Sequence, residues 1–295
     1  MKHEITKWCC TFVSGEEKYG IRWIGLHCSK LDSKGHRILV RYIKGKPLAL
    51  TSLEDLTMLF SMLNHLKPRT IYATANIYHE LNSRSSVEDL DNIIACTPTW
   101  DIDNERSKWR ATIEVCRELI SFLESHGISK SIIVKWSGKA AHVHLHHEAI
   151  SPELRRKYSP LDIAYAIVQY TIERLNDKIR NVRLKFSASR LRVDNEHDLQ
   201  QLFTCPLSLH RDLNSVAVCI NPNELDSFDI AWTDPKLFKH YTGWDKFCIG
   251  EADELAIRAI RSVGGYFISR VKRRRKHPPV DEMIMKWLKK LDSVG

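Results

Sequence analysis

The stretch IIVKWSGKAAHVHLH, residues 132–146, decides the fold. Residues 132–136 and 142–146 are rich in β-branched and apolar side chains, so they predict two strands. The small and polar residues 137–141 between them predict the turn that joins these strands. Such a turn offers backbone N–H groups, a hydroxyl, an ammonium and an imidazole, which together suit the binding of a triphosphate.

Three histidines, His142, His144 and His146, fall on one face of the second predicted strand, because side chains alternate along a strand. Two interpretations stay open at this point. Imidazoles on one strand face suit a transition-metal site. A polar row also suits the solvent-facing half of an amphipathic strand.

Outward from this hairpin, short runs of β-branched and aromatic residues alternate with stretches of helical period, which indicates an α/β or α+β arrangement. Ser52 and Asp55 predict a capping box for a helix that ends before Pro68, and Ser159 predicts the N-cap of another helix. The expected strands are 20–26, 37–43 and 70–78, and the expected helices run from Ser52, over 108–126, and from Pro160 to about Ile179.

Composition excludes several classes of protein. The chain has 295 residues, of which 43% are hydrophobic and 27% are charged, so wholesale disorder is excluded. No stretch is apolar for the roughly 18 residues of a membrane span, and the N-terminus does not resemble a signal peptide. We therefore expect a soluble protein without membrane contact, located in the cytoplasm with the nucleoid or in the nucleus.

Charge and cysteine patterns add two expectations. The formal net charge is +9, and residues 251–295 carry 11 Lys and Arg against 6 Asp and Glu, which suits a polyanionic partner. Eight cysteines without any Cys-x-x-Cys spacing predict buried small side chains, with neither a disulfide scaffold nor a zinc site.

The sequence Asp101-Ile102-Asp103 places two carboxylates on one side of an extended segment. Both can reach one metal site, and paired acids suit Mg²⁺ or Mn²⁺, which take carboxylate oxygens and leave room for substrate phosphates. Asp-x-Asp also occurs in solvated loops and helix caps, so this spacing alone does not decide between the two.

A third group of polar residues lies between positions 189 and 211. Asp194 follows Val193 and offers a third carboxylate, with Asp198 as a competing candidate. Ser208, His210 and Arg211 follow Pro206 and offer phosphate donors. The alternatives are a helix cap for the acid and an ordinary polar turn for the residues after the proline.

Taken in order, the three groups resemble the motifs of the archaeo-eukaryotic primase superfamily, specifically the small catalytic subunit of DNA primase. The resemblance covers roughly residues 70–230 and rests on Asp101-x-Asp103, on the turn from Ser137 to His142, and on Val193-Asp194 followed by 206–210. It departs from that family at Ala140, where a glycine is usual, and at Asp212, where a basic residue is usual. The family's cysteine-rich zinc element is absent.

This resemblance implies an α+β fold, two-lobed, with mixed or antiparallel sheets flanked by helices and the acids in the cleft. It implies that Asp101, Asp103 and Asp194 hold two Mg²⁺ or Mn²⁺ ions. The nucleotide-binding residues that it implies are Ser137, Lys139, His142, Ser208, His210 and Arg211.

The implied activity is template-dependent nucleotidyl transfer, in which primers are made from nucleoside triphosphates on single-stranded DNA. We expect residues 1–250 to form the catalytic domain and 251–295 to form a basic helical segment. Its run 270–276 would follow template phosphates, and its apolar stripe 280–291 packs on its own domain or docks a primase large subunit. The alternatives are a gap-filling polymerase as in end-joining ligases, a metal-dependent nuclease, and a catalytically silent nucleic-acid-binding module.

Overall fold

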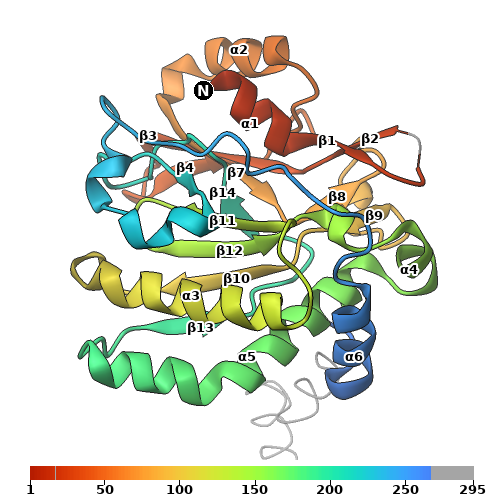
Figure 1. The fold of residues 1–295 in the computed structure, drawn as a ribbon. Helices are drawn as coiled ribbons and strands as arrows, with labels where there is room; N and C mark the ends of the chain where they lie inside the picture. The colour runs from red at the N-terminus through yellow and green to blue at the C-terminus, as the bar shows by residue number, and fades with distance from the viewer. Residues whose placement is uncertain (17, 267–295) are drawn as a thin grey trace, which may run out of the picture.

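The chain has an α+β fold, and its described residues form four antiparallel sheets that lie among helices (Figure 1). The computed structural model describes residues 1–16 and 18–266. Helices α1 and α2 lie at one end of the molecule, and α5 and α6 lie at the other. The helices are α1 (Lys2–Cys9), α2 (Leu53–Met62), α3 (Trp109–Ser125), α4 (Pro152–Lys157), α5 (Pro160–Lys185) and α6 (Asp253–Val263).

The central sheet has five strands in the order β13-β10-β12-β11-β15, and each neighbouring pair is antiparallel. The predicted hairpin is confirmed, because β11 and β12 pair directly across the turn that joins them. The strands are β10 (Thr99–Asp103), β11 (Ile132–Trp136), β12 (Ala141–Leu145), β13 (Arg192–Asp194) and β15 (Val218–Ile220).

Three further antiparallel sheets lie in the part of the chain that the structure describes. The second large sheet has the order β14-β7-β3-β4, with β3 (Ile24–Leu31), β4 (Arg37–Val40), β7 (Pro68–Thr74) and β14 (Leu202–Thr204). A third has the order β1-β2-β8-β9, with β1 (Cys10–Val13), β2 (Lys18–Ile21), β8 (Asn76–Tyr78) and β9 (Ile93–Cys96). The fourth is the pair β5 (Tyr42–Ile43) and β6 (Lys46–Pro47).

Helix ends agree with local signals in part. Ser52 and Asp55 form the predicted capping box of α2, and Gly127, at φ +80°, follows the end of α3. Ser159 precedes α5 as expected, but its side chain makes no capping hydrogen bond, and α5 continues to Lys185. The sequence did not predict α1. Helix α1 packs against the second core through Ile5 and Trp8, so tertiary contacts stabilise this helix.

The two faces of the central sheet differ sharply. One face is apolar and packs on α3 and α5 in the main core, with residues such as Trp100, Ile102 and Val143. The other face is polar along β10, β12 and β13, and near β11 and β15 it meets a second core. That core joins the second sheet to α1 and α2. The two largest buried clusters among the described residues therefore lie against opposite faces of the central sheet.

The C-terminal part is described as far as residue 266, and both the basic run 270–276 and the stripe 280–291 lie outside the described residues. Helix α6 joins the main core through Leu255 and Ala259. All eight cysteines are free, and six of them are buried, as expected. None of the described helices combines the length and apolar character needed to cross a bilayer.

Lys135 on β11 is the most unusual buried group on the polar face. Its side chain is fully buried, its Nζ has no hydrogen-bond partner among the described residues, and it lies 4.2 Å from the ring centroid of Trp8. Burial lowers the pKa of Lys135 to about 8. Between about pH 8 and the unfolded value near 10.4, the unfolded chain therefore holds more protons at this site.

We expect Lys135→Met to stabilise the protein at pH 7 by about 1–3 kcal/mol, because the desolvation penalty of the ammonium exceeds its attraction to Trp8. Stability of the wild type should rise with pH between 8 and 10.4 relative to the variant, since the unfolded state then binds more protons. Urea unfolding at pH 7, 9 and 10.5 measures both effects. A less stable variant at pH 7 would contradict the expectation.

Candidate active site

A row of polar side chains crosses the polar face of the central sheet. In the strand register Asp194 lies opposite Asp101, Asp101 opposite His142, His142 opposite Lys135, and Lys135 opposite Cys219. Residues directly opposite one another in antiparallel strands point to the same face. We call these five side chains the polar row. Asp103 lies two residues beyond Asp101 on the same face, opposite Arg192.

The polar row runs from the interior to the surface. Lys135 is fully buried, and the side chain of His142 is 8% exposed. Exposure then rises to 18% for Asp101 and 39% for Asp194. The carboxylates therefore lie at the solvent-accessible end of the polar row, where a substrate can reach them. The buried side chains at the other end hold the strands in position.

Asp101 is the least exposed of the three predicted acids, and it contacts His142. The Nε2 atom of His142 lies 3.3 Å from Oδ1 of Asp101. Burial by itself raises the pKa of Asp101, but the attraction and hydrogen bond of His142 outweigh it, so the pKa lies below its usual value. Asp101 is thus held as a carboxylate near neutral pH.

Asp103 and Asp194 share a cation from the chain itself. Arg192 donates from its Nη2 to Asp103 at 2.5 Å, and its Nε lies 2.7 Å from Oδ2 of Asp194. Burial raises the pKa of Asp194 in spite of this arginine, and the charges of Asp101 and Asp103 add to the rise. A guanidinium bridging two carboxylates marks a position with strong attraction for positive charge.

A fourth acid, Glu196, joins the cluster, and the sequence analysis missed it. Its carboxyl shares a hydrogen bond with Asp101, and burial together with the charges of Asp101 and Asp194 raises the pKa of Glu196 to about 7. The side chain of Gln201 donates a hydrogen bond to Oε2 of Glu196. One signal was present, because Asp194-Asn195-Glu196 repeats the spacing of Asp101-Ile102-Asp103.

The two candidates for the third acid, Asp194 and Asp198, have different surroundings in the structure. Asp194 lies opposite Asp101 on the neighbouring strand. The carboxylate of Asp198 instead accepts the backbone N–H groups of Gln200 at 2.6 Å and Gln201 at 2.5 Å, so it closes a local turn.

The predicted phosphate-binding turn packs against the third motif. Gly138 has φ +108°, and a Cβ atom there would lie 2.7 Å from Cβ of His210, so a larger residue would collide. Ala140 has no positive φ, and its replacement of the family's usual glycine therefore leaves this turn unstrained. Ser137 donates from Oγ to the carbonyl of Ala140 at 3.0 Å, so this hydroxyl already has a partner.

The residues of the third motif have structural partners. Oγ of Ser208 accepts the N–H of Ile71 at 2.7 Å. Burial lowers the pKa of His210 to about 4, and its Nδ1 accepts two backbone N–H groups, so the ring is neutral at pH 7. Arg211 pairs with Asp212 at 3.0 Å. The nucleotide-binding roles predicted for these residues stay predictions.

A cavity of about 480 Å³ lies beside the acids, and Asp103 is part of its wall. We call it the basic cavity, because four cationic side chains line it. They are Lys139, Arg183, Arg190 and Arg192. Glu105 in the same wall pairs with Arg190 at 3.2 Å, and Nε of Arg183 is buried with no partner among the described residues. Such a wall favours a polyanionic occupant.

The donor set suits a hard divalent cation. No group of three or more His, Cys, Asp or Glu side chains in residues 1–16 and 18–266 is arranged to hold a metal ion by itself. Mg²⁺ is usually bound by one or two carboxylates, with water and substrate phosphates completing the shell. Pairs of carboxylates beside a cavity for an anion therefore fit this ion.

The solvent-facing interpretation of the histidines is wrong. His142, His144 and His146 are all buried, and β12 ends at Leu145, before the last of them. The ring centroid of His144 lies 6.0 Å from that of Phe203 on β14 and 5.2 Å from that of Trp8 on α1, so this ring packs between the central sheet and its neighbours. Neighbouring elements cover the face of β12 that carries the histidines. The alternation of residues in the sequence does not reveal this burial.

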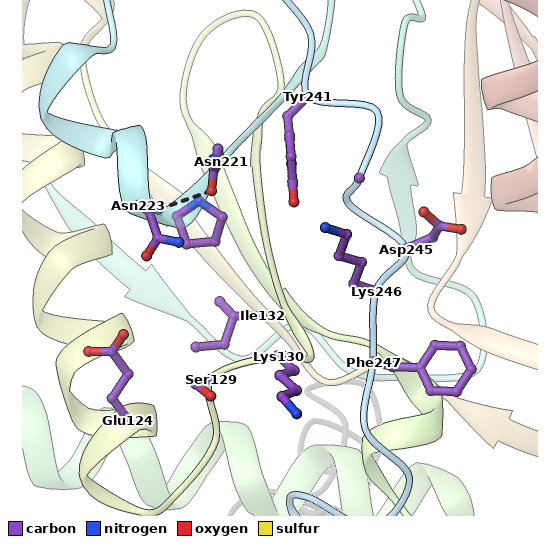
Figure 2. A pocket seen from close by; sticks show the side chains of 12 residues that line it. Glu124, Ser129, Lys130, Ile132, Asn221, Asn223, Tyr241, Asp245, Lys246 and Phe247 are labelled. Carbon is purple, nitrogen blue, oxygen red and sulfur yellow. Dashed lines mark hydrogen bonds between the residues drawn. The ribbon is translucent and has the colours of Figure 1, made fainter.

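A second cavity, of about 510 Å³, lies near the start of β11 and the end of β15 (Figure 2). Figure 2 shows Tyr241 and Lys246 directed toward it, while Phe247 points away. Lys130 and Lys246 in its wall are balanced by Glu124 and Asp245. It contains none of the predicted site residues, so the acids and the basic cavity define the candidate site.

Comparison with known proteins adds one likeness. No protein-family model matches the sequence, and no curated protein matches it. Among solved structures, the chain is similar to the polymerase domain of ligase D from Mycobacterium tuberculosis, in complex with DNA. The match covers 83% of this chain and 82% of that chain, with 16% sequence identity and a TM-score of 0.44.

We expect Arg192→Ala to strengthen Mn²⁺ binding about two- to fivefold, because the guanidinium competes for the oxygens of Asp103 and Asp194. The decrease of the free-ion electron paramagnetic resonance signal measures this binding. Arg180→Ala is the matched control, since that arginine pairs with Asp177 on α5 and should leave binding unchanged. Equal or weaker Mn²⁺ binding by the Arg192 variant would contradict the competition.

Proposed function

We propose that this chain is a template-dependent nucleotidyltransferase that uses nucleoside triphosphates and divalent cations. One observation supports this most: Asp101 and Asp194 are aligned on adjacent strands, and Asp103, two residues beyond Asp101 on the same face, lines a cavity with a basic wall. A nuclease needs the acids but not a cavity that fits a triphosphate. The basic cavity therefore favours transfer over hydrolysis.

In the proposed reaction a 3′ hydroxyl attacks the α-phosphorus in line, and the bond from that phosphorus to the bridging oxygen of pyrophosphate breaks. Asp101, Asp103 and Asp194 would hold Mg²⁺ or Mn²⁺, which when bound would supply the positive charge that stabilises the attacking and leaving oxygens. His142 orients the carboxylate of Asp101, and Arg192 has to leave the carboxylates that it bridges.

The basic cavity is proposed to take the triphosphate. Lys139 extends from the turn after β11, while Arg183 and Arg190 reach the cavity from the end of α5 and the loop after it. These cations would neutralise the β- and γ-phosphates and align the α-phosphorus with the acids, and such positioning accounts for much of catalysis in phosphoryl transfer. Ser137 and His210 would support the turn rather than bind phosphate directly.

Asp103→Ala should abolish nucleotide incorporation while the protein stays folded, because Asp103 is half-exposed and packs against no core. The assay resolves by length the products formed from labelled nucleoside triphosphates, single-stranded template and Mg²⁺ or Mn²⁺. Parallel thermal unfolding curves serve as the folding control. Polymerisation by the folded variant would overturn the assignment.

Lys139→Met should raise KM for the nucleoside triphosphate about tenfold with a smaller change in kcat, since it removes a charge-assisted contact to phosphate. Lys130→Met is the matched control, because Lys130 lines the other cavity. Steady-state kinetics with an annealed primer measure both variants. An unchanged KM for the Lys139 variant would place the triphosphate elsewhere.

The same assay without an annealed primer distinguishes the two polymerase activities. New chains formed without a primer would establish primer synthesis, the activity that the primase resemblance implies. Extension of an annealed primer only would establish gap filling, which the missing zinc element favours.

A further inference from the structure

We infer that the edge of the second sheet, formed by β4 and the turns before and after it, binds the phosphate backbone of a single DNA strand and leads that strand to the candidate site. This inference deepens the proposed function and rests on it, because a template-dependent transferase has to hold a template strand beside its acids. We call this surface the basic edge. Its cationic side chains are Lys30, Lys34, Arg37, Arg41, Lys44 and Lys46.

The positive charge of residues 1–250 is concentrated on the basic edge. Residues 27–47 contain six Lys and Arg against one Asp, whereas the rest of residues 1–250 contains 28 Lys and Arg against 29 Asp and Glu. The net positive charge of residues 1–250 therefore comes from this one segment. Such a concentration of one sign fits a polyanionic partner.

The basic edge lies along an outer strand of the second sheet. In the order β14-β7-β3-β4, strand β4 has a neighbouring strand on one side only among the described residues. The turn from Asp32 to His36 precedes β4 and carries Lys34. The turn between β5 and β6 follows β4, and Lys44 and Gly45 form it at φ +49° and +81°. The cations are thus distributed from one end of β4 to the other.

The four lysines of the basic edge keep their charge available to a partner. All four are exposed, and none of them pairs with an acid among the described residues. Exposed lysines elsewhere differ, since Lys178 pairs with Glu118 at 2.6 Å and Lys239 with Glu224 at 3.2 Å. Unpaired ammonium groups on turns can contact phosphates without first breaking an ion pair.

The outer face of the second sheet adds rings and apolar surface beside these charges. His27 on β3 lies opposite Leu39 on β4, so both side chains point to the same face. The ring centroids of His27 and Tyr72 lie 6.3 Å apart, and Leu39 is 44% exposed. Partly exposed rings beside a row of cations suit a single strand, whose bases can stack while its phosphates contact the cations.

The loop of the third motif connects the basic edge to the candidate site. Arg37 contacts Asp212 at 3.3 Å, and the backbone N–H of Asp212 donates to Nδ1 of His210 at 3.1 Å. His210 in turn packs on Gly138, in the turn that carries Lys139. A strand that follows β4 therefore reaches the basic cavity by passing over this loop, and it meets cationic side chains at both ends of that path.

The experiment measures binding of a fluorescein-labelled oligothymidylate of about 20 nucleotides to the full chain by fluorescence anisotropy, between about 50 and 300 mM salt. We expect the triple variant Lys30→Gln, Lys34→Gln, Lys46→Gln to bind about tenfold more weakly at 100 mM salt. The slope of log affinity against log salt concentration should fall by about 2, because each phosphate contact to a single strand contributes about 0.7.

The matched control replaces three exposed lysines outside the basic edge and the candidate site. Lys130→Gln, Lys157→Gln, Lys246→Gln removes the same charge, and we expect it to bind like the wild type. Thermal unfolding of both triple variants verifies that folded protein is measured.

A second readout locates the bound strand directly. Acetylation of lysines in the wild type, with and without the oligothymidylate, is quantified by peptide mass spectrometry. We expect protection at Lys30, Lys34 and Lys46, and none at Lys130 and Lys246. This readout does not depend on any contribution of the basic run 270–276 to the affinity.

Two results would overturn the inference while the proposed function stands. The first is a triple variant of the basic edge that binds with the affinity and salt dependence of the wild type. The second is displacement of the oligothymidylate by poly-glutamate as readily as by unlabelled oligothymidylate of equal charge, which would assign the surface to an acidic protein. The proposed function is tested separately, because a wild type that incorporates no nucleotide would contradict it whatever these binding results are.

Discussion

The site depends on the register of β10 with its two neighbours. Asp101 meets Asp194 on one side and His142 on the other, while Ile102 meets Val193 and Ala141 on the opposite face. A slip by one residue would turn the acids into the apolar core and place Ile102 in the cleft. Because the cost of burying unpaired carboxylates is several kcal/mol each, the core itself specifies the register that assembles the acids.

The charges on the polar face are arranged in a way that folding alone does not favour. At the buried end, Lys135 has no hydrogen-bond partner among the described residues, and near the other end the charge of Asp101 helps to raise the pKa of Glu196. Both features oppose stability, since one desolvates a cation and the other brings like charges together. Strongly perturbed groups beside a cavity are typical of functional sites, where substrate or cation binding supplies the missing compensation.

Local signals made about half of the site predictable. The hairpin of β11 and β12, the capping box at Ser52 and the shared face of Asp101 and Asp103 follow from residues close in sequence. The pairing of Asp194 with Asp101 spans 93 positions, and only the resemblance of ordered motifs indicated it.

The features that were missed depend on tertiary packing. The histidines of β12 are polar by composition, yet they are buried because the second sheet and α1 cover that face. Glu196 lies after the end of β13, so strand periodicity does not place it beside Asp101. Arg183 and Arg190 of the basic cavity come from the end of α5 and the loop after it, where no spacing rule relates them to the acids.

The motif residues around His210 also connect the two cores. Arg69 on β7 donates to the carbonyl of His210 at 2.8 Å and to that of Leu213 at 2.7 Å, while Gly138 packs on the imidazole ring. The loop therefore links the second sheet to the turn of the central hairpin, beside the basic cavity. Substitution of His210 would shift the turn that carries Lys139, so a loss of activity there would not by itself assign phosphate binding to the histidine. Asp103 and Asp194 can be assigned more directly, because their half-exposed carboxylates contribute little to packing.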